Sequence, residues 1–277
     1  MIRRPPRSTL SSSSAASDVY KRQVFDRVNR LGTKLTDADL ALAHICGKWP
    51  NARRVMKNKI QEYNHHKFYF DLNFMVRCLT GIITGHALFD QIHQTTRDEL
   101  EDGWKRFSKV LDYLINILRS QAYIHSTEDL NTTNVLVPVV VYLAKNDVRF
   151  RNEQDMKQCI YWMYAAHTWA RYTGQTDQRL DHDIGIILRS KSPWNELRNA
   201  IIDQRGRIEV KANDFEGRST QHPLYRMTYI LVKARGAIDW FNGISLDQPI
   251  GKHYWINSHH IFPTSLLYSC LLYTSDA

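Results

Sequence analysis

A stripe of apolar residues at helical spacing is the feature that most constrains this chain. Its members step by three and four positions: Leu100, Trp104, Phe107, Val110, Leu111, Leu114 and Leu118. Such spacing places the side chains on one face of an α-helix, because the helix repeats every 3.6 residues. The pattern therefore predicts a helix of about 25 residues whose apolar face is buried.

The same periodicity recurs along most of the chain, and strand-like alternation is scarce. Thr36 followed by Asp39 predicts a capping box at one helix start. At another start, Ser192 places a side-chain acceptor ahead of Pro193. Further helices are predicted at residues 36–48, 52–63, 70–84, 154–172, 193–203 and 223–235. The tryptophans in these patterns are predicted to lie in the core: Trp104, Trp162, Trp169 and Trp194. The predicted fold class is mainly α.

Residues 131–143 are ambiguous, because their valines favour a strand while the surrounding pattern favours a helix. We interpret them as a helix that is bent or begun at Pro138. Residues 206–220 are polar and punctuated by glycine, which predicts a loop. Asn242 and Gly243 predict a turn, after which short apolar segments begin a new unit.

Cationic residues in and beside the predicted loop are candidates for nucleic-acid binding: Arg205, Arg207, Lys211 and Arg218. They could contact phosphates, and Phe215 could stack on a base. The alternative is a plain solvated loop. The formal net charge of +9 at pH 7 permits a polyanionic partner but does not decide the fold.

The two ends of the chain are related through their codons. Residues 18–23 can be encoded by a DNA string whose reverse complement, read one base out of frame, encodes residues 270–275. We therefore expect residues 1–23 and 270–277 to be translated sequencing adaptor that does not contribute to the fold, with 1–23 disordered.

The remaining cysteines, Cys46, Cys78 and Cys159, lie far apart and form no C-x-x-C pair. They suit a reducing compartment, so the cytoplasm is the expected location, and they give no zinc signature. No apolar run reaches the length of a membrane span, since residues 135–143 are too few and contain Pro138.

Two adjacent histidines follow a short apolar run near the end of the sequence, in the segment 254–263. A histidine that ends a strand can serve as the general base for phosphodiester hydrolysis beside a bound cation. His260 is the candidate base, and His259 is the candidate metal ligand. The alternative is a pair of surface residues at a turn, since a second doublet, His65 and His66, occurs elsewhere.

Another acidic and histidine-containing group occurs at Asp181, His182 and Asp183. Its members could offer metal ligands, but consecutive residues on a helix point in different directions. The preferred interpretation is a solvated helix start.

Two segments resemble the GmrSD-type restriction endonucleases. The first, residues 234–243 followed by a linker and residues 259–263, is similar to the junction into the HNH domain of that family. The second, residues 24–36, is similar to the end of its ParB/sulfiredoxin-like domain. Asn29 and Gly32 suit a strand-to-helix turn there, and Thr36 opens the helix. The family's Asp-Gly-Gln-Gln-Arg motif is absent, so no nucleotide-binding residue is assigned.

The resemblance implies a layout. Residues 24–50 would be the C-terminal remnant of an α/β ParB-like domain, residues 51–243 a helical domain, and residues 244–269 the first strand and start of a truncated HNH (ββα) finger. The intact parent would bind a divalent ion, Mg²⁺ by preference, and its missing N-terminal part could bind a nucleotide.

The implied function is that of a metal-dependent HNH DNA endonuclease for modification-dependent restriction of foreign DNA. The fragment itself is expected to be inactive, because the other metal ligands of the family lie beyond about residue 269. DNA is the expected partner, with no membrane, and the oligomeric state stays open. The alternative is a non-enzymatic helical nucleic-acid-binding or adaptor module.

Overall fold

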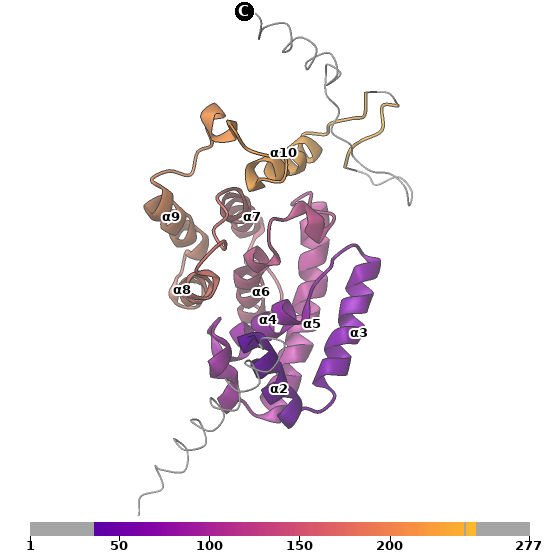
Figure 1. The fold of residues 1–277 in the computed structure, drawn as a ribbon, viewed down its shortest axis with the longest axis vertical. Coiled ribbons are helices and arrows are strands. Elements are labelled where there is room, and N and C mark those ends of the chain that lie inside the picture. The colour runs from indigo at the N-terminus through magenta and orange to yellow at the C-terminus, as the bar shows by residue number, and fades with distance from the viewer. Residues whose placement is uncertain (1–35, 241, 248–277) are drawn as a thin grey trace, which may run out of the picture. The chain divides into compact units, whose positions relative to one another are not determined.

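The computed structural model describes residues 36–240 and 242–247, and these residues are mainly α-helical (Figure 1). Within them the only β pairing is one isolated antiparallel bridge, between Ile238 and Ser245. The fold class predicted from periodicity is therefore confirmed for this part of the chain. The chain separates into two compact units, Met1–Met227 and Thr228–Ala277. The domain boundaries implied by the resemblance stay predictions.

Nine α-helices and four short 3-10 helices make up the described part. The α-helices are α2 (Asp37–Lys48), α3 (Ala52–His65), α4 (Leu72–Thr84), α5 (Arg97–Ser120), α6 (Val137–Lys145), α7 (Glu153–Thr168), α8 (Thr176–Arg189), α9 (Pro193–Arg205) and α10 (Pro223–Ala234). The 3-10 helices are η1 (Phe89–Gln94), η2 (Thr127–Asp129), η3 (Thr133–Leu136) and η4 (Ala212–Phe215).

Helix α5 carries the apolar stripe and confirms its interpretation. The helix has 24 residues, and every member of the stripe is buried. Its start is fixed by a capping box in which Thr96 accepts from the Glu99 backbone and Glu99 accepts from the Thr96 backbone. Burial of the stripe and the capped first turn together explain why this segment is one long helix.

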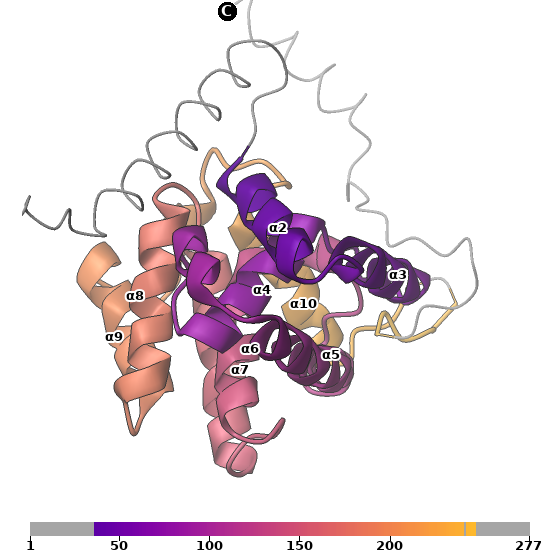
Figure 2. The same ribbon diagram turned by 90° about the horizontal axis from the view of Figure 1, so that it is seen from below.

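Helix α6 is the central helix of the first unit. All its residues from Val137 to Ala144 are buried, and it packs against α4, α5 and α8. Figure 2 shows α4 between α2 and α6, consistent with its contacts to both. The run of valines is therefore a core helix, and Pro138 lies in its first turn as predicted. A helix surrounded by others is apolar on all sides, which explains the missing periodicity.

Two local predictions differ from the structure at helix ends. Ser192 makes no side-chain cap to α9, although Pro193 occupies the first turn as expected; the Ser192 hydroxyl is not the acceptor that the sequence suggested. Helix α7 ends at Thr168, short of residue 172, and Ala170 follows with φ of 48°. The chain turns there because residues 169–175 fold into a separate connection to α8.

Three of the four tryptophans confirm the core prediction. Trp104, Trp162 and Trp194 are buried, and the rings of Trp162 and Trp194 lie 5.5 Å apart. Trp169 is half-buried, and its ring N–H donates to the Ile208 carbonyl at 2.9 Å. This bond ties the end of α7 to the segment after α9.

Helix α4 approaches α6 closely at a glycine. A Cβ atom built at Gly81 would lie 2.8 Å from Cγ2 of Val141 and 3.3 Å from Cδ1 of Ile184. We expect Gly81→Ala to lower the free energy of unfolding by about 1–3 kcal/mol, because packed helices cannot withdraw without strain. Urea unfolding of the purified variant measures the effect.

Gly47→Ala in α2 is the matched control. A Cβ there would meet no atom within 4 Å. The control should gain about 0.5–1 kcal/mol, the usual difference in helix propensity between alanine and glycine. Equal stabilisation of both variants would show that the contact between α4 and α6 does not require a glycine.

Candidate functional site

The residues that carry the resemblance fall mostly outside the described part. Four of them lie outside it: His259, His260, Asn29 and Gly32. Their roles as metal ligand, base and turn residues therefore stay predictions. Thr36 is described, and it caps α2 through the predicted box: its hydroxyl accepts from the Asp39 backbone at 3.2 Å. The local helix start expected at the end of that segment is thus confirmed.

The junction segment before the histidines changes from helix to turn. Helix α10 ends at Ala234, and Gly236 follows in the left-handed region with φ of 69°. Ile238 then bridges to Ser245 in antiparallel orientation, and the chain turns between them: Asn242 lies in the turn, and Gly243 has φ of 70° and donates to the Asp239 carbonyl at 2.9 Å. The predicted turn is confirmed.

Two of the three arginines proposed for nucleic-acid contact, Arg205 and Arg207, have partners within the protein. Arg205 donates to the Trp169 carbonyl at 3.0 Å. Arg207 forms an ion pair with Asp214 at 2.6 Å, and its guanidinium lies 5.5 Å from the centre of the Trp169 ring. Arg205 is nevertheless exposed, as are the other two predicted cations, Lys211 and Arg218. Their role in binding stays a prediction, but the two arginines already have structural partners.

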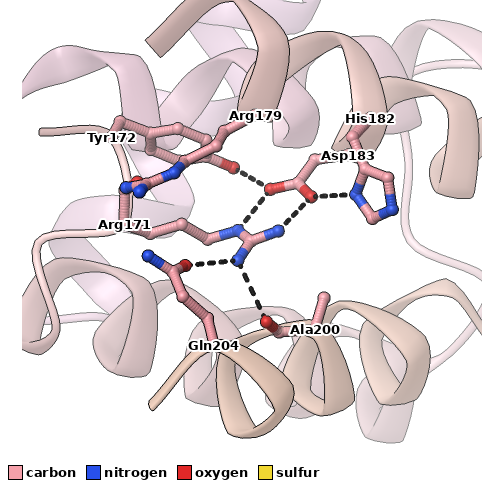
Figure 3. Close-up of polar contacts among 7 residues, drawn as sticks. All are labelled: Arg171, Tyr172, Arg179, His182, Asp183, Ala200 and Gln204. Atoms are coloured by element: carbon pink, nitrogen blue, oxygen red, sulfur yellow. Dashed lines mark hydrogen bonds and ion pairs between the residues drawn. The ribbon is translucent and has the colours of Figure 1, made fainter. Parts of the chain in front are cut away.

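A buried ion pair between Arg171 and Asp183 is the strongest polar cluster in the described residues (Figure 3). Asp183 is fully buried and Arg171 is 4% exposed. The pair is bidentate: Nε donates to Oδ2 at 2.6 Å, and Nη2 donates to Oδ1 at 2.5 Å. Two parallel bonds of this kind fix the guanidinium plane as well as its position.

Further bonds connect the pair to Tyr172 and to helix α9. The Tyr172 hydroxyl donates to Oδ2 of Asp183 at 2.6 Å. The remaining nitrogen of Arg171, Nη1, donates to the Ala200 carbonyl and to the Gln204 side chain, each at 3.4 Å. Because Asp183 belongs to α8 and the two acceptors belong to α9, the cluster fastens the connection after α7 to both helices.

Burial and charge act on the titrations of this cluster. Burial lowers the pKa of Arg171, but its bonds to Asp183 outweigh that cost, so the net shift is upward. Burial also raises the pKa of Tyr172, and the neighbouring Asp183 carboxylate raises it further. Arg171 is therefore fixed as a cation and Tyr172 as a neutral donor, which makes both unsuited to proton transfer near neutral pH.

His182 lies at the edge of the same cluster, beside an open hollow of about 450 Å³ between α8 and α9. Its Nδ1 is 3.2 Å from Oδ1 of Asp183, while its side chain is 54% exposed. The carboxylate orients the ring, but the same carboxylate is also held by Arg171 and Tyr172. The arrangement is that of a structural anchor with an exposed histidine at its rim.

The structure corrects the interpretation of residues 181–183 as a solvated helix start. Asp183 lies well inside α8 and on its buried face, whereas Asp181 accepts from the Ala87 backbone at 2.9 Å. The sequence reasoning missed this cluster. A signal was present, because Leu180, Asp183 and Ile187 follow helical spacing, and an acid on an apolar stripe implies a buried partner.

A second buried polar group is His167 in α7, which is 3% exposed. Its Nδ1 accepts from the Asn131 backbone at 3.1 Å, and within the described residues its Nε2 has no hydrogen-bond partner. Burial lowers the pKa of His167 to about 4, with the charge of Arg226 as the next cause. The ring is therefore neutral in the folded protein at neutral pH.

We expect this histidine to make the protein less stable in acid. In the unfolded chain its pKa returns to 6.5, so the unfolded state gains a proton first as the pH falls. Stability is full above pH 6.5 and falls by about 3 kcal/mol toward pH 4, of which about 2 kcal/mol is lost by pH 5. Urea unfolding at pH 7.5 and pH 5 measures the loss.

The variant His167→Gln should remove this part of the pH dependence, since glutamine does not titrate. His66→Gln, at an exposed position after α3, is the control and should leave the dependence unchanged. An identical loss of stability in the unaltered chain and in His167→Gln would contradict the assignment.

Within residues 36–240 and 242–247, no group of three His, Cys, Asp or Glu side chains is arranged to hold a metal ion. Among the same residues, no helix is long and apolar enough to span a membrane. No family model, curated protein or solved structure matches this chain.

Proposed function

We propose that this chain is the helical part, with the start of the nuclease finger, of a metal-dependent HNH DNA endonuclease of the modification-dependent restriction type. The observation that carries the proposal is the order of its motifs: the segment 24–36, then the segment 234–243, then His259 and His260. Each segment resembles the corresponding part of the GmrSD-type enzymes, and two motifs in family order are more specific than either alone.

The described structure supports this proposal at two places. The segment 24–36 leads into a capped helix at Thr36, as a domain end followed by a helix requires. The segment 234–243 ends α10 and turns into an antiparallel bridge before the run that leads to the histidines. A finger of two strands and a helix needs such a change from helix to extended chain at its entrance.

In this proposal His260 takes a proton from water, and His259 is a ligand of the divalent ion. A Mg²⁺ ion would stabilise negative charge on the phosphate and on the leaving oxygen. The described residues provide no metal-binding group of their own, so the partners of His259 would come from elsewhere in the protein. The enzyme would act on DNA in the cytoplasm.

The sequence of the gene on both sides of the codons for this chain tests the proposal. We expect a helix carrying Asn and His, or another metal ligand, soon after residue 269. We also expect the motif Asp-Gly-Gln-Gln-Arg upstream of residue 24. A gene with neither feature would reject the nuclease assignment and favour a non-enzymatic helical adaptor.

A further inference from the structure

A basic hollow lies on the first unit between the outer face of α5 and the end of α6. It has a volume of about 760 Å³, and four cationic side chains line it: Lys105, Arg106, Lys109 and Lys145. Asp102 and Asp147 are the acidic residues in its lining. The two helices pack against each other, so the hollow is built on a fixed framework (Figure 2).

Two of these cations have no partner within the described residues. Arg106 and Lys109 are both exposed, and neither forms a hydrogen bond or an ion pair with another described side chain. They lie three positions apart on α5, which places them on the same side of the helix. The hollow therefore offers two adjacent positive charges that are not neutralised by the fold.

The other two cations are held in ways that leave their charge at the surface. Lys105 pairs with Asp102 at 3.0 Å, but both side chains are about 70% exposed, and such pairs are weak and easily exchanged. Lys145 donates to the Leu188 carbonyl at 2.6 Å, at the end of α8. A backbone carbonyl bears no formal charge, so Lys145 keeps its positive charge.

The rim of the hollow contains strained backbone. Asp147 and Val148 are consecutive residues in the left-handed region, with φ of 53° and 62°. A β-branched residue is rare in that region, because its side chain crowds the backbone. The Val148 N–H donates to the Leu143 carbonyl at 2.9 Å, which closes the end of α6. Strain of this kind collects at functional sites more often than elsewhere.

We propose that this hollow is where the first unit contacts the phosphate backbone of duplex DNA. The inference rests on the proposed function and adds a surface to it. Arg106 and Lys109 are exposed and have no partner among the described residues, whereas Arg207 in the predicted loop is paired with Asp214. Lysine and arginine at the backbone supply sequence-independent affinity and position the duplex without reading bases.

Binding of the full chain to a fluorescein-labelled 20-base-pair duplex, followed by anisotropy between 50 and 200 mM salt, tests the proposal. The double variant R106Q/K109Q should bind about tenfold to a hundredfold more weakly at 0.1 M salt. The slope of log K against log salt should fall by about 2, one unit for each lost phosphate contact. Circular dichroism should show unchanged helicity, because both side chains are exposed.

The variant R53Q/K57Q is the matched control, since it removes the same charge from two exposed positions on helix α3. It should keep the affinity and the salt slope of the unaltered chain. A loss in R53Q/K57Q with none in R106Q/K109Q would overturn the inference, and equal losses would overturn it as well, because they would show a general effect of net charge.

Failure of this inference and failure of the proposed function are distinguishable. If the unaltered chain binds the duplex and R106Q/K109Q binds it equally, only the assignment of the hollow falls. If the unaltered chain does not bind at 50 mM salt, or binds polyglutamate as tightly, the hollow is not a DNA surface. The nuclease assignment is then still decided by the flanking gene sequence.

Discussion

The variant Asp183→Ala should lower the free energy of unfolding by about 3–5 kcal/mol, a large part of the stability of a typical domain. The fully buried carboxylate accepts two bonds from Arg171 and one from Tyr172. Its removal leaves a guanidinium buried without a counter-ion, since Arg171 is 4% exposed. Urea unfolding followed by circular dichroism at pH 7.5 measures the change.

The double variant Arg171→Met/Asp183→Leu separates the lost pair from a general loss of packing. It removes both charges and fills the space with apolar side chains, so it should recover much of the stability. Asp102→Ala, which breaks an exposed pair with Lys105, should change stability little. A loss below 1 kcal/mol in Asp183→Ala, or an equal loss in the double variant, would contradict an anchor based on charge pairing.

The variant His260→Ala should abolish Mg²⁺-dependent DNA cleavage, measured in the protein encoded by this chain together with its flanking gene sequence. A general base contributes about 10²- to 10⁴-fold to a rate, so the cleavage rate should fall by at least a hundredfold. DNA affinity, measured in Ca²⁺ to prevent cleavage, should be unchanged, because a base acts on water and not on binding.

His65→Ala is the matched control, because His65 and His66 form the other histidine doublet in the sequence and lie exposed at the end of α3. That variant should cleave like the unaltered protein. Cleavage retained in His260→Ala would reject this residue as the base. Loss of cleavage together with loss of helicity would instead identify His260 as necessary for folding.

The fold was predictable where one helix face is buried and the other is solvated. Helix α5 is the clearest case, since its stripe gave the helix and its buried face together. Helix α6 was harder, because it is buried on all sides and its valines also suit a strand; only the helical pattern of the surrounding chain favoured a helix. Helix α8 was predicted only as a solvated helix start at residues 181–183, because Asp183 interrupts its apolar stripe.

The candidate sites were predictable only in part, for a different reason. A motif such as the doublet at 259–260 can be found by its order along the chain. The pairing of Arg171 with Asp183, and the occupation of Arg205 and Arg207, depend on side chains that meet only in the folded protein. The composition of the basic hollow likewise depends on α5 and α6 being neighbours.

The order of Arg171 and Asp183 along the chain has a consequence for biosynthesis. The ribosome makes the cation before the acid that neutralises it, and α9, which supplies the other acceptors, comes later still. The guanidinium must stay hydrated until α8 has emerged, because a lone buried charge is strongly unfavourable. The connection after α7, residues 169–175, therefore stays solvated until Asp183 in α8 has been synthesised. Packing of this connection against α8 and α9 is delayed until that point.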